Sequence, residues 1–229
     1  MPNKSIPELI DLLDVGTQAE RQQAIDTFFE HGTDAIQPMV DALENASVGQ
    51  SKAIASILSQ MGNMAFALLA TIILENTAPV SKIQGALIAL SRMDDPRVVE
   101  VLVNVIMDET SNLHDAAMIS LTHYGKRTHD KRVTQILQGL LEHENGYIRA
   151  ESSQYLIEQL GAESIYIFKP LLTHNAYFVR QSAVESLGNL GTESAIMSLQ
   201  PALNDDDVGV RIKAKAITEQ HGYDPETLS

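Results

Sequence analysis

The chain has 229 residues, a hydrophobic content of 44%, a charged content of 20% and a formal net charge of −14. These values are typical of a folded protein with a substantial core and unlike those of a disordered chain. Because the sequence contains no cysteine, it excludes disulfides, thiolate metal sites and cysteine nucleophiles, and its negative field disfavours general binding of nucleic acid.

The N-terminal segment MPNKSIPELIDLLD turns acidic at once and lacks the apolar core of a signal peptide. The longest apolar run, MAFALLATIIL at residues 64–74, is shorter than the stretch of about 20 residues that spans a bilayer. We therefore expect a cytoplasmic protein with no membrane insertion. Residues 1–115 contain 6 basic and 16 acidic side chains, against 10 and 14 in residues 116–229, so the first half is the more acidic.

A glycine recurs at intervals close to 31 residues, each time after an apolar helical pattern. Glycine suits the left-handed position that follows a helix, so each one marks the expected end of a repeat. The interval between Gly125 and Gly161 is longer, at 36 residues, and we interpret the segment 123–132 as a loop insertion of about five residues. The repeat ends are expected near residues 32, 62, 94, 125, 161, 191 and 222, with an aspartate at position 94.

Each repeat contains two helical patterns. The first has a small residue eight positions before most of the repeat ends and a large apolar residue four positions later, which places both on one helix face. The second is an apolar run, in which Pro170 and Pro201 lie one period apart and predict a kink. The pattern predicts an all-α fold, an α-solenoid of about seven helix pairs forming a right-handed superhelix, as one domain over residues 1–229. The small residues are Ala24, Ala86, Ala117, Ala183 and Ala214.

The unit resembles the HEAT repeat, and the form VR-x-x-A-x-x-x-L-G-x-L-G at residues 179–191 resembles the phycobilisome-lyase type of HEAT-like repeat. The resemblance covers essentially the whole chain and is to the family of phycobilin lyases of the E/F type and phycobilisome degradation protein B. The solenoid without a catalytic motif favours a non-catalytic scaffold that binds a protein partner in its concave groove. The resemblance implies that the protein handles phycobiliprotein subunits or their bilin, by attachment, removal or presentation. The implied ligand is a phycobilin such as phycocyanobilin, and no cofactor is required.

Two other functions stay open at this point. One is a bilin lyase, or a subunit of one, that attaches or removes a phycobilin. The other is an adaptor for a metal-cofactor assembly system, in which the acidic first half recruits a basic partner. We assign no catalytic residue, because the sequence has no glycine-rich phosphate loop, no G-x-S-x-G and no H-E-x-x-H.

We also expect no metal site. A related HEAT-like family, the deoxyhypusine hydroxylases, binds two irons through repeated His-Glu pairs, and here only His143-Glu144 matches. His143 and His174 lie at equivalent positions of neighbouring repeats. Stacked helices are about 8–10 Å apart, so these two side chains do not easily reach one ion.

Arg149, Arg180 and Arg211 recur one period apart. Arg can bind a ligand carboxylate through two parallel hydrogen bonds. We favour a structural role, in which each arginine pairs with a polar side chain of the preceding turn and links adjacent repeats; these side chains are Glu144, Asn175 and Asp206. The basic stretch HYGKRTHDKR at 123–132 is either a solvated loop or a contact for an acidic partner.

The outward face of the first helix of each repeat is the expected binding surface, because this helix usually lines the concave side of a solenoid. With Ala183 and Leu187 inward, positions 185, 186 and 189 face away from the other layer. At equivalent positions the middle repeats carry apolar side chains with polar ones around them, which is typical of a binding groove. The alternative is that helix tilt buries the isoleucines. The residues expected to bind the partner are Ile57, Ile88, Arg92, Ile119, His123, Tyr155 and Arg127.

Overall fold

The structure is a computed structural model, and it describes residues 4–228. Helices follow one another along this part of the chain, which contains no strand, so the prediction of an all-α solenoid is confirmed. The chain divides into two compact units, one ending at His129 and the other beginning at Asp130. In the described part of the chain, no helix combines the length and the apolar character needed to cross a bilayer.

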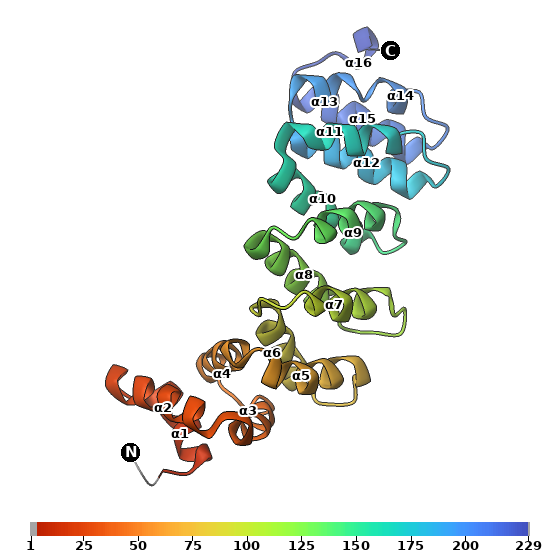
Figure 1. Ribbon diagram of the computed structural model, residues 1–229. Helices are drawn as coiled ribbons and strands as arrows, with labels where there is room; N and C mark the ends of the chain where they lie inside the picture. The colour runs from red at the N-terminus through yellow and green to blue at the C-terminus, as the bar shows by residue number, and fades with distance from the viewer. Residues whose placement is uncertain (1–3, 229) are drawn as a thin grey trace. The chain divides into compact units, whose positions relative to one another are not determined.

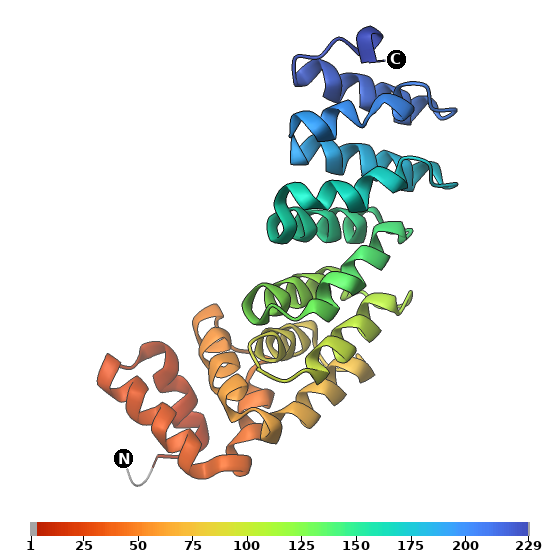
Figure 2. The same ribbon diagram turned by 45° about the horizontal axis from the view of Figure 1, so that its top comes forward.

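The first unit has two helical layers (Figures 1 and 2). Helices α4, α6 and α8 pack side by side, while α3, α5 and α7 pack across them. Helix α1 lies against α2, α3 and α4. The helices of this unit are α1 (Ile6–Val15), α2 (Gln18–His31), α3 (Ile36–Ala42), α4 (Val48–Met61), α5 (Asn63–Glu75), α6 (Val80–Ser91), α7 (Arg97–Met107) and α8 (His114–Thr128), with a 3-10 turn η1 (Gly32–Ala35).

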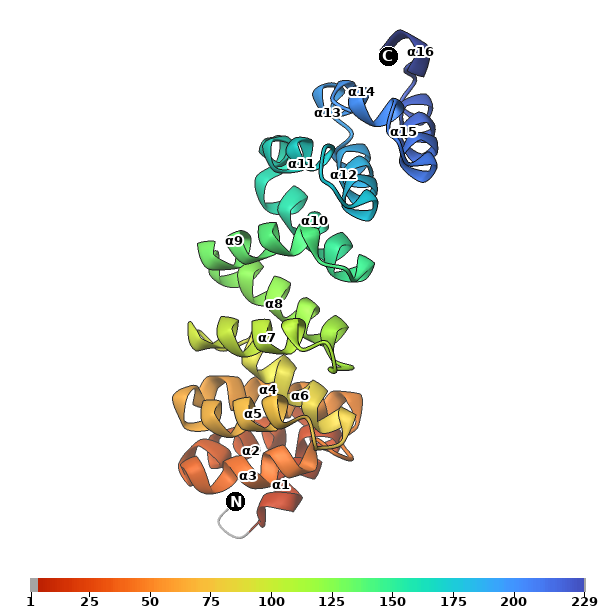
Figure 3. The same cartoon turned by 90° about the vertical axis from the view of Figure 1, so that its right-hand side faces the viewer.

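The second unit repeats this arrangement. Helices α10, α12 and α15 form one layer, and α9, α11 and α14 pack across it; Figure 3 shows α12 and α15 side by side. The helices of this unit are α9 (Lys131–Gly139), α10 (Gly146–Leu160), α11 (Ile165–Leu171), α12 (Tyr177–Leu190), α13 (Glu193–Met197), α14 (Gln200–Leu203), α15 (Val208–Gln220) and α16 (Pro225–Leu228), with 3-10 turns η2 (Leu140–Glu142) and η3 (Gly161–Ser164).

The small residues chosen from the sequence lie in the core, as the helical pattern predicts. Ala24, Ala86, Ala117, Ala183 and Ala214 are each at most 1% exposed. The large apolar residue four positions later is equally buried, for example Phe28 and Leu187. Pro201 lies at the start of α14 and separates it from α13, so the second helix of this repeat is interrupted where a kink is expected.

Most repeat-end glycines have the positive φ that the sequence predicts, but of those that cap a helix only Gly191 is left-handed helical, because Gly32, Gly62 and Gly161 have ψ between −123° and −132°. Gly32, Gly62, Gly161, Gly191 and Gly222 all have positive φ, and the first four immediately follow α2, α4, α10 and α12. The prediction for Gly125 is wrong. This residue is buried inside α8, and His129, with φ of 54°, takes the left-handed position instead.

The interpretation of residues 123–132 as a loop insertion is also wrong, because the extra residues lengthen α8 to Thr128 and α9 begins at Lys131. No proline interrupts this stretch, and Lys126 and Arg127 lie in the last turn of α8, where cations interact favourably with the helix dipole. Arg127 also forms an ion pair with Asp94 and donates to the carbonyl of Met93, which fixes the added turn against the end of α6.

Candidate functional site

Four of the seven predicted binding residues lie on the outer side of two neighbouring helices in the first unit. Ile88 and Arg92 belong to α6 and its C-cap, and Ile119 and His123 occupy the equivalent positions on α8. Helices α6 and α8 pack directly against each other. Ile119 is 57% exposed, His123 is exposed, and Ile88 and Arg92 are half-buried. We call these four residues the α6–α8 surface.

The expectation that Ile57 and Tyr155 are exposed is wrong, since they are only 1% and 2% exposed. In each of their helices one buried residue faces the second helix layer. Ile57 and Tyr155 lie three residues after it. The same position is buried in other repeats, where it holds Ala89, Ser120 and Ser186. At this position a side chain packs against the neighbouring first helix of its own layer; Ser186, for example, accepts a hydrogen bond from the hydroxyl of Ser153 on α10 across 2.6 Å.

The two predicted arginines of the first unit have defined partners. Arg92 donates from Nη1 to the carbonyl of Lys52, 3.3 Å away on α4. Arg127 pairs with Asp94, and its guanidinium lies 5.6 Å from the ring centre of Tyr124. Arg127 therefore fastens α8 to the end of α6, and a role in partner binding stays a prediction.

The three periodic arginines of the second unit share one anchor. In each, Nη1 donates to the two backbone carbonyls that lie six and five residues earlier; for Arg180 these are His174 and Asn175, at 2.8 and 3.0 Å. The preceding turn thus contributes its backbone, and the predicted pairing with the side chains of Glu144, Asn175 and Asp206 is wrong. The arginine side chain has five N–H donors in a rigid planar group, and the contact with the two carbonyls uses those of Nη1. The opposite edge, with Nε and Nη2, then points away from the repeat that contains the arginine.

That free edge links two pairs of repeats. Arg180 holds both carboxylate oxygens of Asp205, with Nε–Oδ2 and Nη2–Oδ1 distances of 2.6 and 2.8 Å. The hydrogen bond from Arg180 is the main cause that lowers the pKa of Asp205, although burial opposes it. Arg149 instead donates from Nε to the hydroxyl of Ser182 and lies 4.9 Å from the ring centre of Phe178; burial lowers its pKa. The predicted linking of adjacent repeats is confirmed for these two arginines.

Sequence reasoning missed Asp205 as a partner of Arg180, although a signal was present. Asp205 lies at the same place in its repeat as His143 and His174, and all three side chains accept a hydrogen bond from the backbone N–H two residues later. Each of the two histidines therefore caps its own turn. Among the described residues, no group of three or more His, Cys, Asp or Glu side chains is placed to hold a metal ion.

The match to a family model agrees with the repeat architecture. Residues 133–218 match the HEAT repeats family. Human deoxyhypusine hydroxylase in complex with glycerol is 19% identical and has a TM-score of 0.37, covering 97% of this chain and 91% of its own. The complex of CpcE and CpcF of phycocyanin lyase from Nostoc sp. PCC7120 is 16% identical, with a TM-score of 0.38 and 96% of each chain covered.

A designed armadillo repeat protein in complex with the peptide (KR)4 is also 16% identical, with a TM-score of 0.30, and the match covers 96% of this chain and 100% of that one. No curated protein matches the chain. None of these structural similarities identifies a function.

Proposed function

We propose that this HEAT-like repeat protein is a non-catalytic scaffold that binds a protein partner through the α6–α8 surface. The observation that carries the proposal is the exposure of Ile119, whose side chain is 57% exposed on α8, the last helix of the layer formed by α4, α6 and α8. Ile88 lies half-buried at the equivalent position of the preceding repeat.

The polar surroundings of Ile119 support this proposal. Arg92 and His123 lie one helical turn beyond the two isoleucines, so an apolar centre is bordered by two groups that donate hydrogen bonds. Protein interfaces have this organisation, with a few desolvated anchors inside a polar rim. The packed helices beneath hold the backbone of both anchors in place, which reduces the entropy lost on binding.

As the partner we propose a phycobiliprotein subunit, with its bilin as the accompanying ligand. The repeat form at residues 179–191 supports this choice through its resemblance to the phycobilisome-lyase type of repeat. Arg92 supplies a cationic group and His123 a hydrogen-bonding group for the propionates of an extended tetrapyrrole, and Ile88 and Ile119 supply apolar surface. In this proposal the protein presents or shields the bilin, and its own side chains perform no acid–base step.

The experiment is a titration of the protein with purified phycocyanin subunits that carry the bilin and with the same subunits without it. Free phycocyanobilin, followed by its visible spectrum, forms a third arm. We expect the subunits to bind, and we expect Arg92→Gln to weaken the bilin-loaded form more than the bilin-free form. Absence of binding in all three arms would overturn the choice of partner. Covalent transfer of the bilin by the protein alone would instead establish a lyase.

A further inference from the structure

The periodic arginines of the second unit differ in what occupies their outward edge. For Arg180 the occupant is the carboxylate of Asp205, and the two side chains are only 15% and 7% exposed. Arg211 has the same backbone anchor, with Nη1 donating to the carbonyls of Asp205 and Asp206. Within residues 4–228, however, no carboxylate forms an ion pair with Arg211.

Arg211 lines a cavity of about 310 Å³ whose other walls come from the end of α14 and from α16. Lys215 lies one turn further along the helix and also lines this cavity, together with Asn204 and the 64% exposed Ile212. The two cations favour an anionic occupant, although Lys215 also lies 4.0 Å from the carboxylate of Glu219 on its own helix. Glu226, on α16, is the acidic side chain of the lining, and its negative charge disfavours an anionic occupant.

The bridge between Arg180 and Asp205 shows how a polypeptide fills such an edge. Asp205 comes from a turn in which its carboxylate also accepts the N–H of Asp207, so the turn presents the carboxylate in a fixed direction. Four residues after Asp205, the α-carbon of Gly209 passes close to Gln181 of α12. Ile212 lies one repeat after Gln181, at the equivalent position. A ligand turn that packs on α15 as this turn packs on α12 would therefore place its backbone against the apolar side chain of Ile212.

We propose that Arg211 and Lys215 form a carboxylate-binding site for an acidic turn of a partner polypeptide, which presents an aspartate as Asp205 is presented to Arg180. The site does not depend on the proposed role of the α6–α8 surface. A second copy of the chain does not supply this turn, because each copy holds its Asp205 with its own Arg180. The whole chain has a net charge of −14 and therefore repels an acidic ligand at long range. The affinity of the site then depends on the local pairing with the two cations and on the salt concentration.

The test uses the full chain and a labelled, blocked peptide with the sequence LNDDDVGV, which is that of residues 203–210. A matched peptide replaces its first aspartate with asparagine. Fluorescence anisotropy at low salt should show binding of the first peptide that is weakened about tenfold by Arg211→Gln, because two charge-assisted hydrogen bonds are lost. The asparagine peptide should be weakened by a similar factor.

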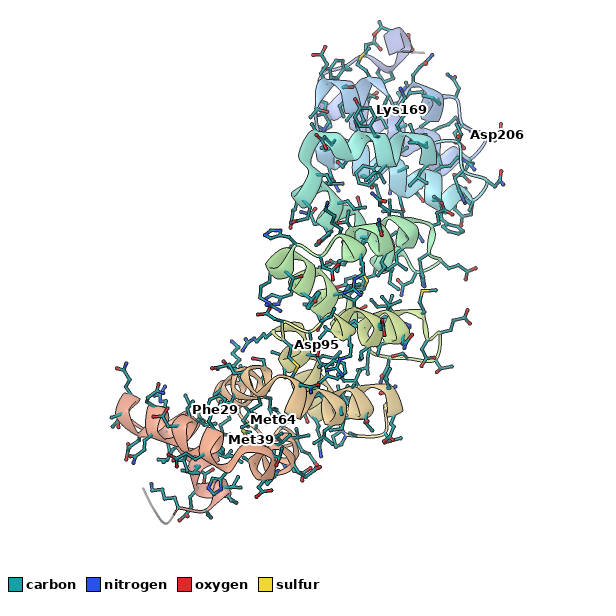
Figure 4. All side chains as sticks on the ribbon, in the orientation of Figure 1. Phe29, Met39, Met64, Asp95, Lys169 and Asp206 are labelled. Atoms are coloured by element: carbon teal, nitrogen blue, oxygen red, sulfur yellow. The ribbon has the colours of Figure 1, made fainter. Side chains whose placement is uncertain are left out.

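Lys169→Gln is the control variant, because it removes one exposed positive charge from α11, outside the cavity lining (Figure 4). Its effect on peptide affinity should stay below about twofold. Glu226→Gln should strengthen binding, which is a result that partial unfolding does not produce. Circular dichroism checks that each variant folds, and backbone amide shifts locate the peptide on α15.

Three results would overturn the proposal. The two peptides could bind equally well, Arg211→Gln and Lys169→Gln could lose the same affinity for the peptide, or the amide shifts could lie away from α15. Succinate that competes as well as the peptide would overturn the polypeptide occupant and leave a small-molecule carboxylate site. Self-association that depends on Arg211, measured by sedimentation, would replace the partner with a second copy.

Discussion

Arg180 and Asp205, which belong to neighbouring repeats, are joined by two hydrogen bonds of 2.6 and 2.8 Å between the guanidinium and the carboxylate. The arginine is in turn fixed by the carbonyls of its own preceding turn. The pair therefore couples the turn before α12 to the turn before α15. Because both side chains are largely buried, removal of one partner leaves the other charged and unpaired.

Asp205→Asn should destabilise the protein by about 3 kcal/mol at neutral pH, since it breaks a mostly buried ion pair. Asp206→Asn is the control: Asp206 is exposed and points outward from the same turn (Figure 4). Urea unfolding of both variants measures the difference. Equal stabilities of the two variants would contradict the role given to Asp205.

The same variant predicts a pH dependence. Arg180 holds the folded-state pKa of Asp205 below its ordinary value, so the carboxylate stabilises the fold above the unfolded pKa. This contribution is lost as the pH falls through the folded pKa. The difference in melting temperature between the natural protein and Asp205→Asn should therefore be largest at neutral pH and shrink in acid. A constant difference over this range would contradict the assignment.

Ala183→Leu should destabilise the protein by about 1–3 kcal/mol, because Ala183 is 1% exposed and a larger side chain would overfill the space between helices. Ala150→Leu, at an exposed position of α10, adds the same atoms without a clash. Thermal unfolding compares the two variants. An unchanged melting temperature for Ala183→Leu would show that the buried face of α12 is placed wrongly.

His129→Gly should stabilise the protein by about 1 kcal/mol, because His129 has a φ of 54° and glycine adopts this region without a steric penalty. His123→Gly, inside α8, should instead cost about 0.5–1 kcal/mol. Chemical denaturation of the two variants should give opposite signs. Destabilisation by His129→Gly would mean that the imidazole contributes more than the backbone strain it brings.

The sequence predicted the helices and their inward faces because the period, the small residues and the glycines agree with one another. It did not predict the burial of Ile57 and Tyr155, because a helix in a two-layer stack packs against its neighbours in the layer as well as against the other layer. The small residues Ala89, Ser120 and Ser186 at the same position were the available signal. The prediction of a helix end at Gly125 was wrong because a helix continues through glycine when nothing else stops it. The partner of Arg180 was not predicted because it comes from the next repeat, and the pattern within one repeat does not show contacts between repeats.

The α6–α8 surface makes the central claim testable with two variants of similar exposure. Ile119 is 57% exposed on α8, and Met107, at the end of α7 in the other layer, is 56% exposed. Affinity for phycocyanin subunits, measured by titration calorimetry for Ile119→Glu and Met107→Glu, tests it most directly. We predict that Ile119→Glu weakens binding at least about tenfold, or 1.4 kcal/mol, with an unchanged melting temperature, and that Met107→Glu binds as the natural protein does. Equal affinities of the two variants, or a collapsed melting temperature for Ile119→Glu, would contradict the account.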